Sequence, residues 1–171
     1  MVFDEGQRDI GELGIAMIEH NDHANVRIPP PILTLLFIII AFLLGRFVRL
    51  PFAVPPVVKY IGFGLVVIGF LFGLAAALNF RRARTTLDPY HPVSSIVTSG
   101  VYGFSRNPIY LGFLLMVIGI PLNAGTYWGI ILAPIFILLC NKLVIEHEEA
   151  YLEKRFGETY TSYKSRVRRW L

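Results

Sequence analysis

Three long stretches without a charged residue constrain the fold of this chain more than any other feature of its sequence. Residues 28–45 and 60–80 form runs of 18 and 21 residues between basic side chains, and residues 107–141 form a run of 35. A helix that crosses a bilayer needs about 20 apolar residues, so each of the first two runs predicts one spanning helix. The third is too long for one helix, and its PLNAGT segment at Pro121–Thr126 has the proline, asparagine and glycine of a turn. We therefore expect an all-α integral membrane protein of about four transmembrane helices, the third and fourth forming a helical hairpin.

The distribution of basic residues predicts the orientation of these helices. Thirteen lysines and arginines lie in the N-terminal segment, the loop after residue 80 and the C-terminal segment, against three (Arg46, Arg49 and Lys59) on the opposite side. Basic residues are enriched on the cytoplasmic side of membrane proteins. We expect both termini and the loop after residue 80 to face the cytoplasm, where the positive charge contacts anionic headgroups. No basic and aromatic module typical of nucleic-acid binding is visible, so we expect the membrane and not nucleic acid as the partner.

The chain divides into three predicted parts. Residues 1–27 form a cytoplasmic N-terminal tail, residues 28–80 two transmembrane helices, and residues 81–171 a region with a long loop, the hairpin and a C-terminal amphipathic helix. The loop at residues 81–105 keeps tyrosine, phenylalanine, valine and isoleucine, which a disordered linker lacks. Loops of this length in compact domains are usually functional when ordered, so we expect it to cover a site.

The predicted hairpin brings two polar segments to one height. Arg106, Asn107 and Tyr110 open the third helix, while Glu148 and Glu149 follow the fourth. The two ends of a tight hairpin are neighbours, so we expect these side chains to line a pocket between helices on the cytoplasmic side. The alternative is that the glutamates are a solvated face, with Glu149 and Glu153 exposed and Glu146 paired with Lys142 one turn away.

Several classes of site are not indicated. The four histidines are scattered and Cys140 is the only cysteine, so we expect no metal site. A serine–histidine–aspartate arrangement with a nucleophile elbow is missing from the sequence, as is a glycine-rich phosphate loop between strand and helix. These absences argue against hydrolases and nucleotidases.

Three motifs carry a resemblance to a known family. They are IVTSGVY at residues 96–102, RNPIYLG at residues 106–112, and EEAYLEKRFGETYTSY at Glu148–Tyr163. In this order they resemble the integral-membrane methyltransferase family of isoprenylcysteine carboxyl methyltransferases and phospholipid (phosphatidylethanolamine) methyltransferases. The resemblance covers Arg81–Leu171, and the first two predicted helices match only in hydropathy. It implies that residues 81–171 are a catalytic region with a cofactor loop, whose active site we expect to face the cytoplasm.

The resemblance implies a cofactor, S-adenosylmethionine, and a lipid or lipidated acceptor that enters from the bilayer. Arg106, Glu148 and Glu149 are the residues expected to act in catalysis. By the resemblance, the cofactor contacts are Ser94, Ser95, Ile96, Val97, Tyr102, Asn107, Pro108, Ile109, Tyr110 and Glu148. Methyl transfer is an in-line displacement, for which positioning and exclusion of water contribute most of the catalysis.

This chain departs from the prenylcysteine enzymes at three positions. Asn107 and Ser94 replace histidines, and Val144 replaces a substrate-binding arginine. An unpaired ion is costly in a low-dielectric site, so a carboxylate acceptor loses its expected partner at Val144, and Lys142 would offer only a point charge. An amine or another uncharged nucleophile is therefore expected to be methylated at least as well. Glu146, His147 and Glu149 are the candidates to attract an amine and accept its proton.

Two further functions remain open at this point. Membrane sterol reductases, which use NADPH, are similar in this C-terminal region, and thermal shifts with NADPH or S-adenosylmethionine would separate the two enzymes. A non-enzymatic membrane scaffold would use the polar cluster only as a helix-end anchor. The sequence does not define the acceptor or the oligomeric state.

Overall fold

Prolines mark the start of three of the long helices. α2 spans Pro30–Phe47, α3 spans Pro56–Arg82 and α4 spans Pro108–Asn123. Proline is well suited to the first helical turn because the N–H that it lacks would have no intrahelical partner there, and its φ is already helical. The positions at which these helices begin therefore follow from local backbone chemistry.

The remaining helices follow one another closely. α5 (Trp128–Cys140) passes into a π-helical turn, η2 (Asn141–Ile145), and then into α6 (Glu146–Phe156). Gly157, at a φ of 50°, ends α6 and is followed by α7 (Glu158–Arg166). A short 3-10 helix, η1 (Gly100–Gly103), precedes α4.

The structure, a computed structural model, describes residues 28–48, 50–82 and 96–171, which are helical apart from turns and connections. Within these described residues, three helices are long and apolar enough to cross a membrane: α2, α3 and the continuous Trp128–Phe156 segment. At 16 residues, α4 is about 24 Å long, against a hydrocarbon core of about 30 Å. The all-helical class and the hairpin of α4 and α5 are confirmed. A fourth crossing and a cytoplasmic amphipathic C-terminal helix stay predictions.

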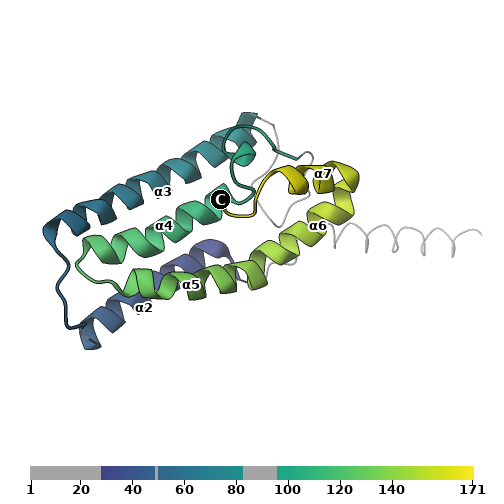
Figure 1. Cartoon of the computed structure of the whole chain (residues 1–171). Helices are drawn as coiled ribbons and strands as arrows, with labels where there is room; N and C mark the ends of the chain where they lie inside the picture. The colour runs from purple at the N-terminus through teal and green to yellow at the C-terminus, as the bar shows by residue number, and fades with distance from the viewer. Residues whose placement is uncertain (1–27, 49, 83–95) are drawn as a thin grey trace, which may run out of the picture.

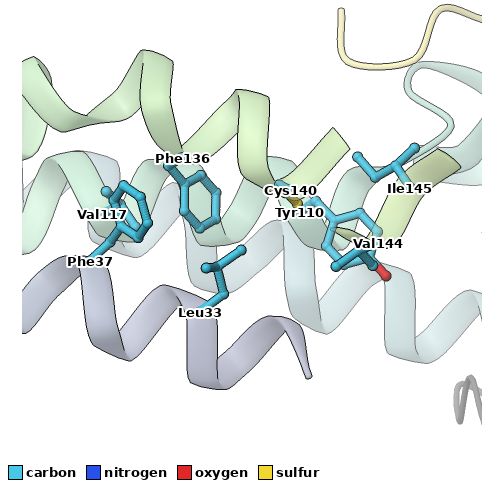
Figure 2. Close-up of a cluster of buried hydrophobic side chains, with 8 residues drawn as sticks. All are labelled: Leu33, Phe37, Tyr110, Val117, Phe136, Cys140, Val144 and Ile145. Atoms are coloured by element: carbon cyan, nitrogen blue, oxygen red, sulfur yellow. The ribbon is translucent and has the colours of Figure 1, made fainter. Parts of the chain in front are cut away.

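The helices form a bundle whose core lies around α4. α3 lies along α4, while α2 packs against both α4 and α5 (Figure 1). Figure 2 shows the main core cluster, in which Phe37 and Phe136 meet edge to face at 5.4 Å between ring centroids. Large apolar side chains such as Phe70 and Leu138 are about 60% exposed on the outside of the bundle, which fits a lipid surround rather than water. Figure 1 also shows that the last turn of α3, the first turn of α4 and the helices α6 and α7 all lie at the same end of the bundle.

Glycines bring the backbones of α3 and α4 into contact. A Cβ added at Gly69 would lie 2.7 Å from the carbonyl oxygen of Gly112, and one at Gly119 would lie 2.6 Å from that of Gly62. Small residues let membrane helices approach this closely. The Gly69/Gly73 spacing predicts a shared packing face, and a Cβ added at Gly112 would indeed approach the backbone of both, at 2.6 Å from the oxygen of Gly69 and 3.6 Å from the nitrogen of Gly73. The contact is closer at Gly69, since a Cβ added at Gly73 would meet no described residue within 4 Å.

Replacing Gly112 by alanine should destabilise the bundle. The added methyl group meets the backbone of α3, which cannot rotate away as a side chain can, so a cost of about 1–3 kcal/mol is expected. Thermal unfolding of purified protein in detergent measures it. Gly64→Ala is the matched control, since nothing lies within 4 Å of that position. Equal midpoints for the two variants would contradict close contact between α3 and α4.

Candidate functional site

The start of α4 and the first turn of α6 meet through one short hydrogen bond. The hydroxyl of Tyr110 donates to Oε1 of Glu148 at 2.6 Å. Tyr110 is buried and Glu148 is partly buried, so the carboxylate has little water to solvate it. The predicted proximity of these two residues across the hairpin is confirmed, and it places a negative pole at this end of the bundle.

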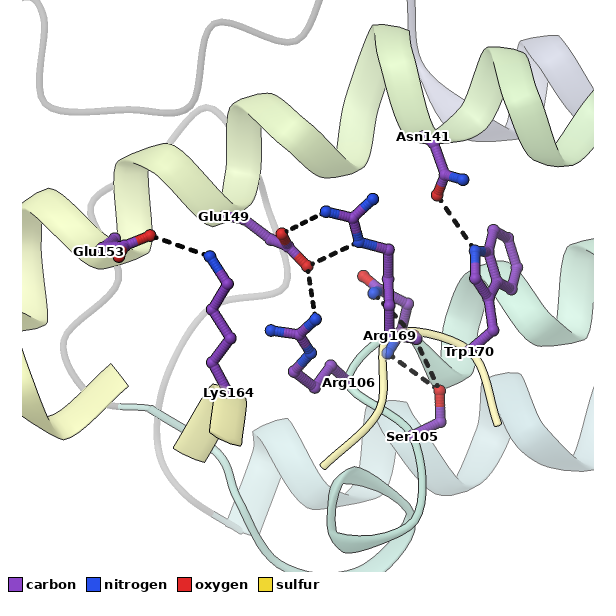
Figure 3. Close-up of polar contacts among 9 residues, drawn as sticks. Ser105, Arg106, Asn141, Glu149, Glu153, Lys164, Arg169 and Trp170 are labelled. Atoms are coloured by element: carbon purple, nitrogen blue, oxygen red, sulfur yellow. Dashed lines mark hydrogen bonds and ion pairs between the residues drawn. The ribbon is translucent and has the colours of Figure 1, made fainter. Parts of the chain in front are cut away.

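Glu149 is the centre of a second polar cluster. Oε1 of Glu149 lies 3.2 Å from Nη2 of Arg106, and Arg169 adds a two-pronged contact, with Nε donating to Oε1 at 3.0 Å and Nη2 to Oε2 at 2.7 Å (Figure 3). The hydrogen bond from Arg169 and the charge of Glu149 raise the pKa of Arg169. Glu149 is only 6% exposed, so the interpretation of this residue as part of a solvated face is wrong. It is a buried carboxylate shared by two guanidinium groups.

Arg106 keeps donors that this cluster does not use. Its side chain is 9% exposed, and its Nε and Nη1 are buried without a hydrogen-bond partner among the described residues. Buried donors are nearly always paired, and leaving one unpaired costs about 1–3 kcal/mol. Two guanidinium groups and one carboxylate also leave the cluster with a net positive charge. An anionic group of a ligand would satisfy both the charge and the free N–H groups.

An apolar wall adjoins the negative pole. Val97, Tyr102 and Ala76 form a buried cluster with partly buried side chains around it, namely Phe80, Val101 and Ile109. The rings of Tyr102 and Phe80 meet edge to face at 5.4 Å between centroids. Burial and the nearby charge of Glu148 raise the pKa of Tyr102, so its phenol stays protonated.

α7 holds this wall in place. The hydroxyl of Tyr163 donates a hydrogen bond of 2.7 Å to the backbone carbonyl of Tyr102. Burial raises the pKa of Tyr163 to about 12, against a smaller lowering by Arg106, so the hydroxyl remains a donor over the physiological pH range. The second short helix thereby fixes the segment that the family resemblance assigns to the cofactor.

Other predicted residues divide between site and surface. Ser94 and Ser95 lie outside the described residues, Ile96 is partly buried, and Pro108 is buried as the first residue of α4. Glu146 pairs with Lys142 at 3.0 Å on the surface, as the alternative interpretation expected for that pair. Nδ1 of His147 is buried and has no hydrogen-bond partner in the part of the chain that the structure describes.

Several contacts were not foreseen from the sequence. The tail after α7 runs beside the start of α4, where Ser105 and Asn107 donate hydrogen bonds to the carbonyl of Arg169 at 3.4 and 2.9 Å (Figure 3). Trp170 donates through its indole N–H to Oδ1 of Asn141 at 3.1 Å. In the sequence, Arg169 is one of several basic residues near the C terminus, and only the need of a buried carboxylate for a cation could have singled it out.

Val144 lies in the core. It is 0% exposed and belongs to the cluster that includes Tyr110, Cys140 and Phe136 (Figure 2). A cation at this position in the present packing would be buried among apolar side chains. Lys142 does not replace it, because its side chain is 71% exposed and paired with Glu146.

Comparison with known proteins identifies the family. Residues 57–159 match the phospholipid methyltransferase family. This segment covers α3 to the start of α7 and includes both polar clusters except for the tail. The chain belongs to the phospholipid methyltransferase family.

Individual relatives agree with this assignment. The chain is 31% identical to methanethiol S-methyltransferase of Pseudomonas deceptionensis over 122 residues, which are 70% of this chain and 45% of that protein. It is 32% identical to protein-S-isoprenylcysteine O-methyltransferase of Schizosaccharomyces pombe over 72 residues, 42% of this chain and 30% of that protein. An uncharacterized protein of Haemophilus influenzae is 44% identical over 66 residues, 37% of this chain and 100% of that protein. The chain therefore spans less than half the length of these methyltransferases of Pseudomonas deceptionensis and Schizosaccharomyces pombe.

Replacing Glu149 by glutamine should destabilise the fold strongly. The change keeps the shape but removes the charge that compensates Arg106 and Arg169, and breaking a buried ion pair from one side costs about 3–5 kcal/mol. Thermal or chemical unfolding in detergent measures the loss. Glu153→Gln is the control, because Glu153 forms a half-exposed pair with Lys164 worth at most about 1 kcal/mol. A loss no larger than in the control would contradict the buried cluster.

Proposed function

We propose that the protein is a membrane-embedded, S-adenosylmethionine-dependent methyltransferase that methylates a lipidic acceptor. The observation that carries the proposal is the pairing of two opposite poles on adjacent residues of α6. Glu148 with Tyr110 forms the negative pole, and Glu149 with Arg106 and Arg169 forms a cluster of net positive charge. Membership of the phospholipid methyltransferase family supports the same activity. It gives no support to a sterol-type reductase or a scaffold.

The described residues fit S-adenosylmethionine. The cofactor carries a carboxylate, an ammonium, a sulfonium and an adenine. The free Nε and Nη1 of Arg106 suit the carboxylate, while Glu148 suits the ammonium or the sulfonium. The apolar wall around Tyr102 and Val97 suits the adenine. When bound, the cofactor supplies a methyl group on a positively charged sulfur, which makes that carbon electrophilic.

The residues of the site then act mainly by holding the reacting groups in position and by excluding water from them. Tyr110 orients the Glu148 carboxylate, and Glu149 positions the guanidinium of Arg106. Asn107 is fixed by two hydrogen bonds, one from its backbone N–H to Ser105 and one from its side chain to the tail. A preorganised polar site with little water strengthens every electrostatic contact in it and holds reacting groups in line.

An apolar cavity near this site suits the lipidic part of an acceptor. It has a volume of about 160 Å³ between α3 and α4 and is lined by apolar residues including Gly73, Leu74 and Ile109. Ile109 precedes Tyr110, the partner of Glu148, so a chain in this cavity would lie close to the negative pole. Leu74 is 45% exposed on the outside of α3, which is consistent with entry from the bilayer.

The charges at the site favour an amine or an uncharged nucleophile over a carboxylate. Val144 offers no cation, Lys142 is on the surface, and the free donors of Arg106 are assigned to the cofactor. Two named relatives act on different atoms: one name states a methanethiol sulfur and the other an isoprenylcysteine oxygen. Basic residues at the end of the bundle that holds the site support a cytoplasmic orientation.

Cofactor binding should depend on Glu148. Glu148→Gln removes the negative pole but keeps its hydrogen-bonding shape, so affinity for S-adenosylhomocysteine should fall by about tenfold or more, the loss of a charge-assisted contact. Isothermal titration calorimetry of detergent-purified protein measures it. Glu146→Gln, whose side chain lies on the surface with Lys142, should bind as the unaltered protein does. No binding to the unaltered protein at millimolar concentration, or stabilisation by NADPH instead, would overturn the proposal.

Acceptor preference can be measured by direct competition. With labelled S-adenosylmethionine and vesicles containing equal amounts of a farnesylated cysteine and phosphatidylethanolamine, the amine lipid should gain at least as much label. The reason is the lack of a fixed cation for the carboxylate at Val144. Because that position is fully buried, Val144→Arg would disturb the core and is not a suitable variant. Labelling of the farnesylated cysteine alone would show that another cation holds its carboxylate.

A further inference from the structure

The chain after α7 crosses the start of α4 in an extended conformation. Val167 has φ −119° and ψ 131°, and the backbone N–H of Arg106 donates to the carbonyl of Arg168 at 3.0 Å. Figure 3 shows this tail beside Ser105 and Arg106, with Trp170 turned toward Asn141. The tail (residues 167–171) therefore contacts the polar segment that precedes α4 through its backbone carbonyls, while the side chains of Arg169 and Trp170 bind Glu149 and Asn141.

Arg169 connects two parts of the site that are distant in sequence. Its backbone carbonyl accepts hydrogen bonds from Ser105 and from the amide of Asn107, while its guanidinium binds both oxygens of Glu149. The first contacts belong to the start of α4 and the last to α6. One residue of the tail thus fixes the separation between the segment that holds Arg106 and the helix that holds Glu149.

The two-pronged contact also determines how Arg106 can pair. Arg169 engages both oxygens of Glu149, so Arg106 approaches with Nη2 alone, at 3.2 Å, and its Nε and Nη1 stay free. Arginine and carboxylate groups prefer a two-pronged arrangement when nothing competes. Without the guanidinium of Arg169, Glu149 would draw a second N–H of Arg106 to itself. Fewer N–H groups of Arg106 would then remain available for an anion.

We propose that Arg169 is a positioning residue that keeps the N–H groups of Arg106 available for the carboxylate of the methyl donor. The inference rests on the proposed function, because it assigns the ligand of Arg106. It adds a role for the tail, which lies outside the segment matched to the family at residues 57–159. Arg169 does not touch the ligand in this account and acts only through Glu149 and Arg106.

The test compares two ligands on full-length variants. The first is S-adenosylhomocysteine, and the second is its analogue with the carboxylate replaced by hydrogen. Arg169→Gln should weaken binding of the first about tenfold, equivalent to about 1.4 kcal/mol, and leave binding of the second unchanged. Arg168→Gln is the matched control, since this exposed neighbour in the tail loses the same charge but contributes only its backbone carbonyl to the contacts. It should bind both ligands as the unaltered protein does.

The same titrations also measure how far a lysine can replace Arg169, and they distinguish a failure of this inference from a failure of the proposed function. Arg169→Lys keeps the charge but not the fork, so it should show a smaller selective loss. If Arg169→Gln cannot be purified in a folded state, Arg169→Lys is titrated in its place. Weaker binding of S-adenosylhomocysteine alone would support the positioning role, and equal weakening of both ligands, or no weakening, would contradict it. Equal weakening of both ligands would make Arg169 merely structural and would overturn the inference. Absence of binding to the unaltered protein would instead reject the proposed cofactor.

Discussion

The ion cluster around Glu149 is the interaction on which the end of this bundle depends. Its carboxylate joins α6 to Arg106 before α4 and to Arg169 in the tail. Taking such charges out of water is expensive, and the cost is recovered only with good geometry and additional hydrogen bonds. The alternatives to the observed arrangement are therefore few. The tail, the segment before α4 and the first turn of α6 are held together as one unit, and the free donors of Arg106 follow from it.

Two adjacent glutamates have different surroundings because of the helix that carries them. Successive residues of an α-helix point about 100° apart, so Glu148 meets Tyr110 while Glu149 meets the two arginines. The π-helical turn just before them, Asn141–Ile145, sets this rotation, and such turns are frequent at functional sites. It also brings Val144 into the core. The same local change of winding is thus consistent with both the polarity of the site and the burial of Val144.

Hydropathy and turn residues predict most of the fold. The apolar runs and their prolines correctly predict the helices, the hairpin and the meeting of Tyr110 with Glu148, but the turn expected at Pro121–Thr126 begins later, because α4 continues through Pro121 to Asn123. The π-helical turn was not predictable, because nothing in its five residues distinguishes it from continued α-helix. The burial of Glu149 was also missed, because the sequence around it does not identify its partner. Its cationic partner Arg169 lies in a tail whose basic residues, by count alone, indicate only orientation.

An experimental structure with S-adenosylhomocysteine bound tests the central claim most directly. The account predicts that the ligand carboxylate lies within hydrogen-bond distance of Nε or Nη1 of Arg106, with the ammonium or sulfur near Glu148, while Arg169 stays on Glu149. These are the unpaired donors and the negative pole described above. A carboxylate held elsewhere, with Nε and Nη1 of Arg106 still unpaired, would contradict the account.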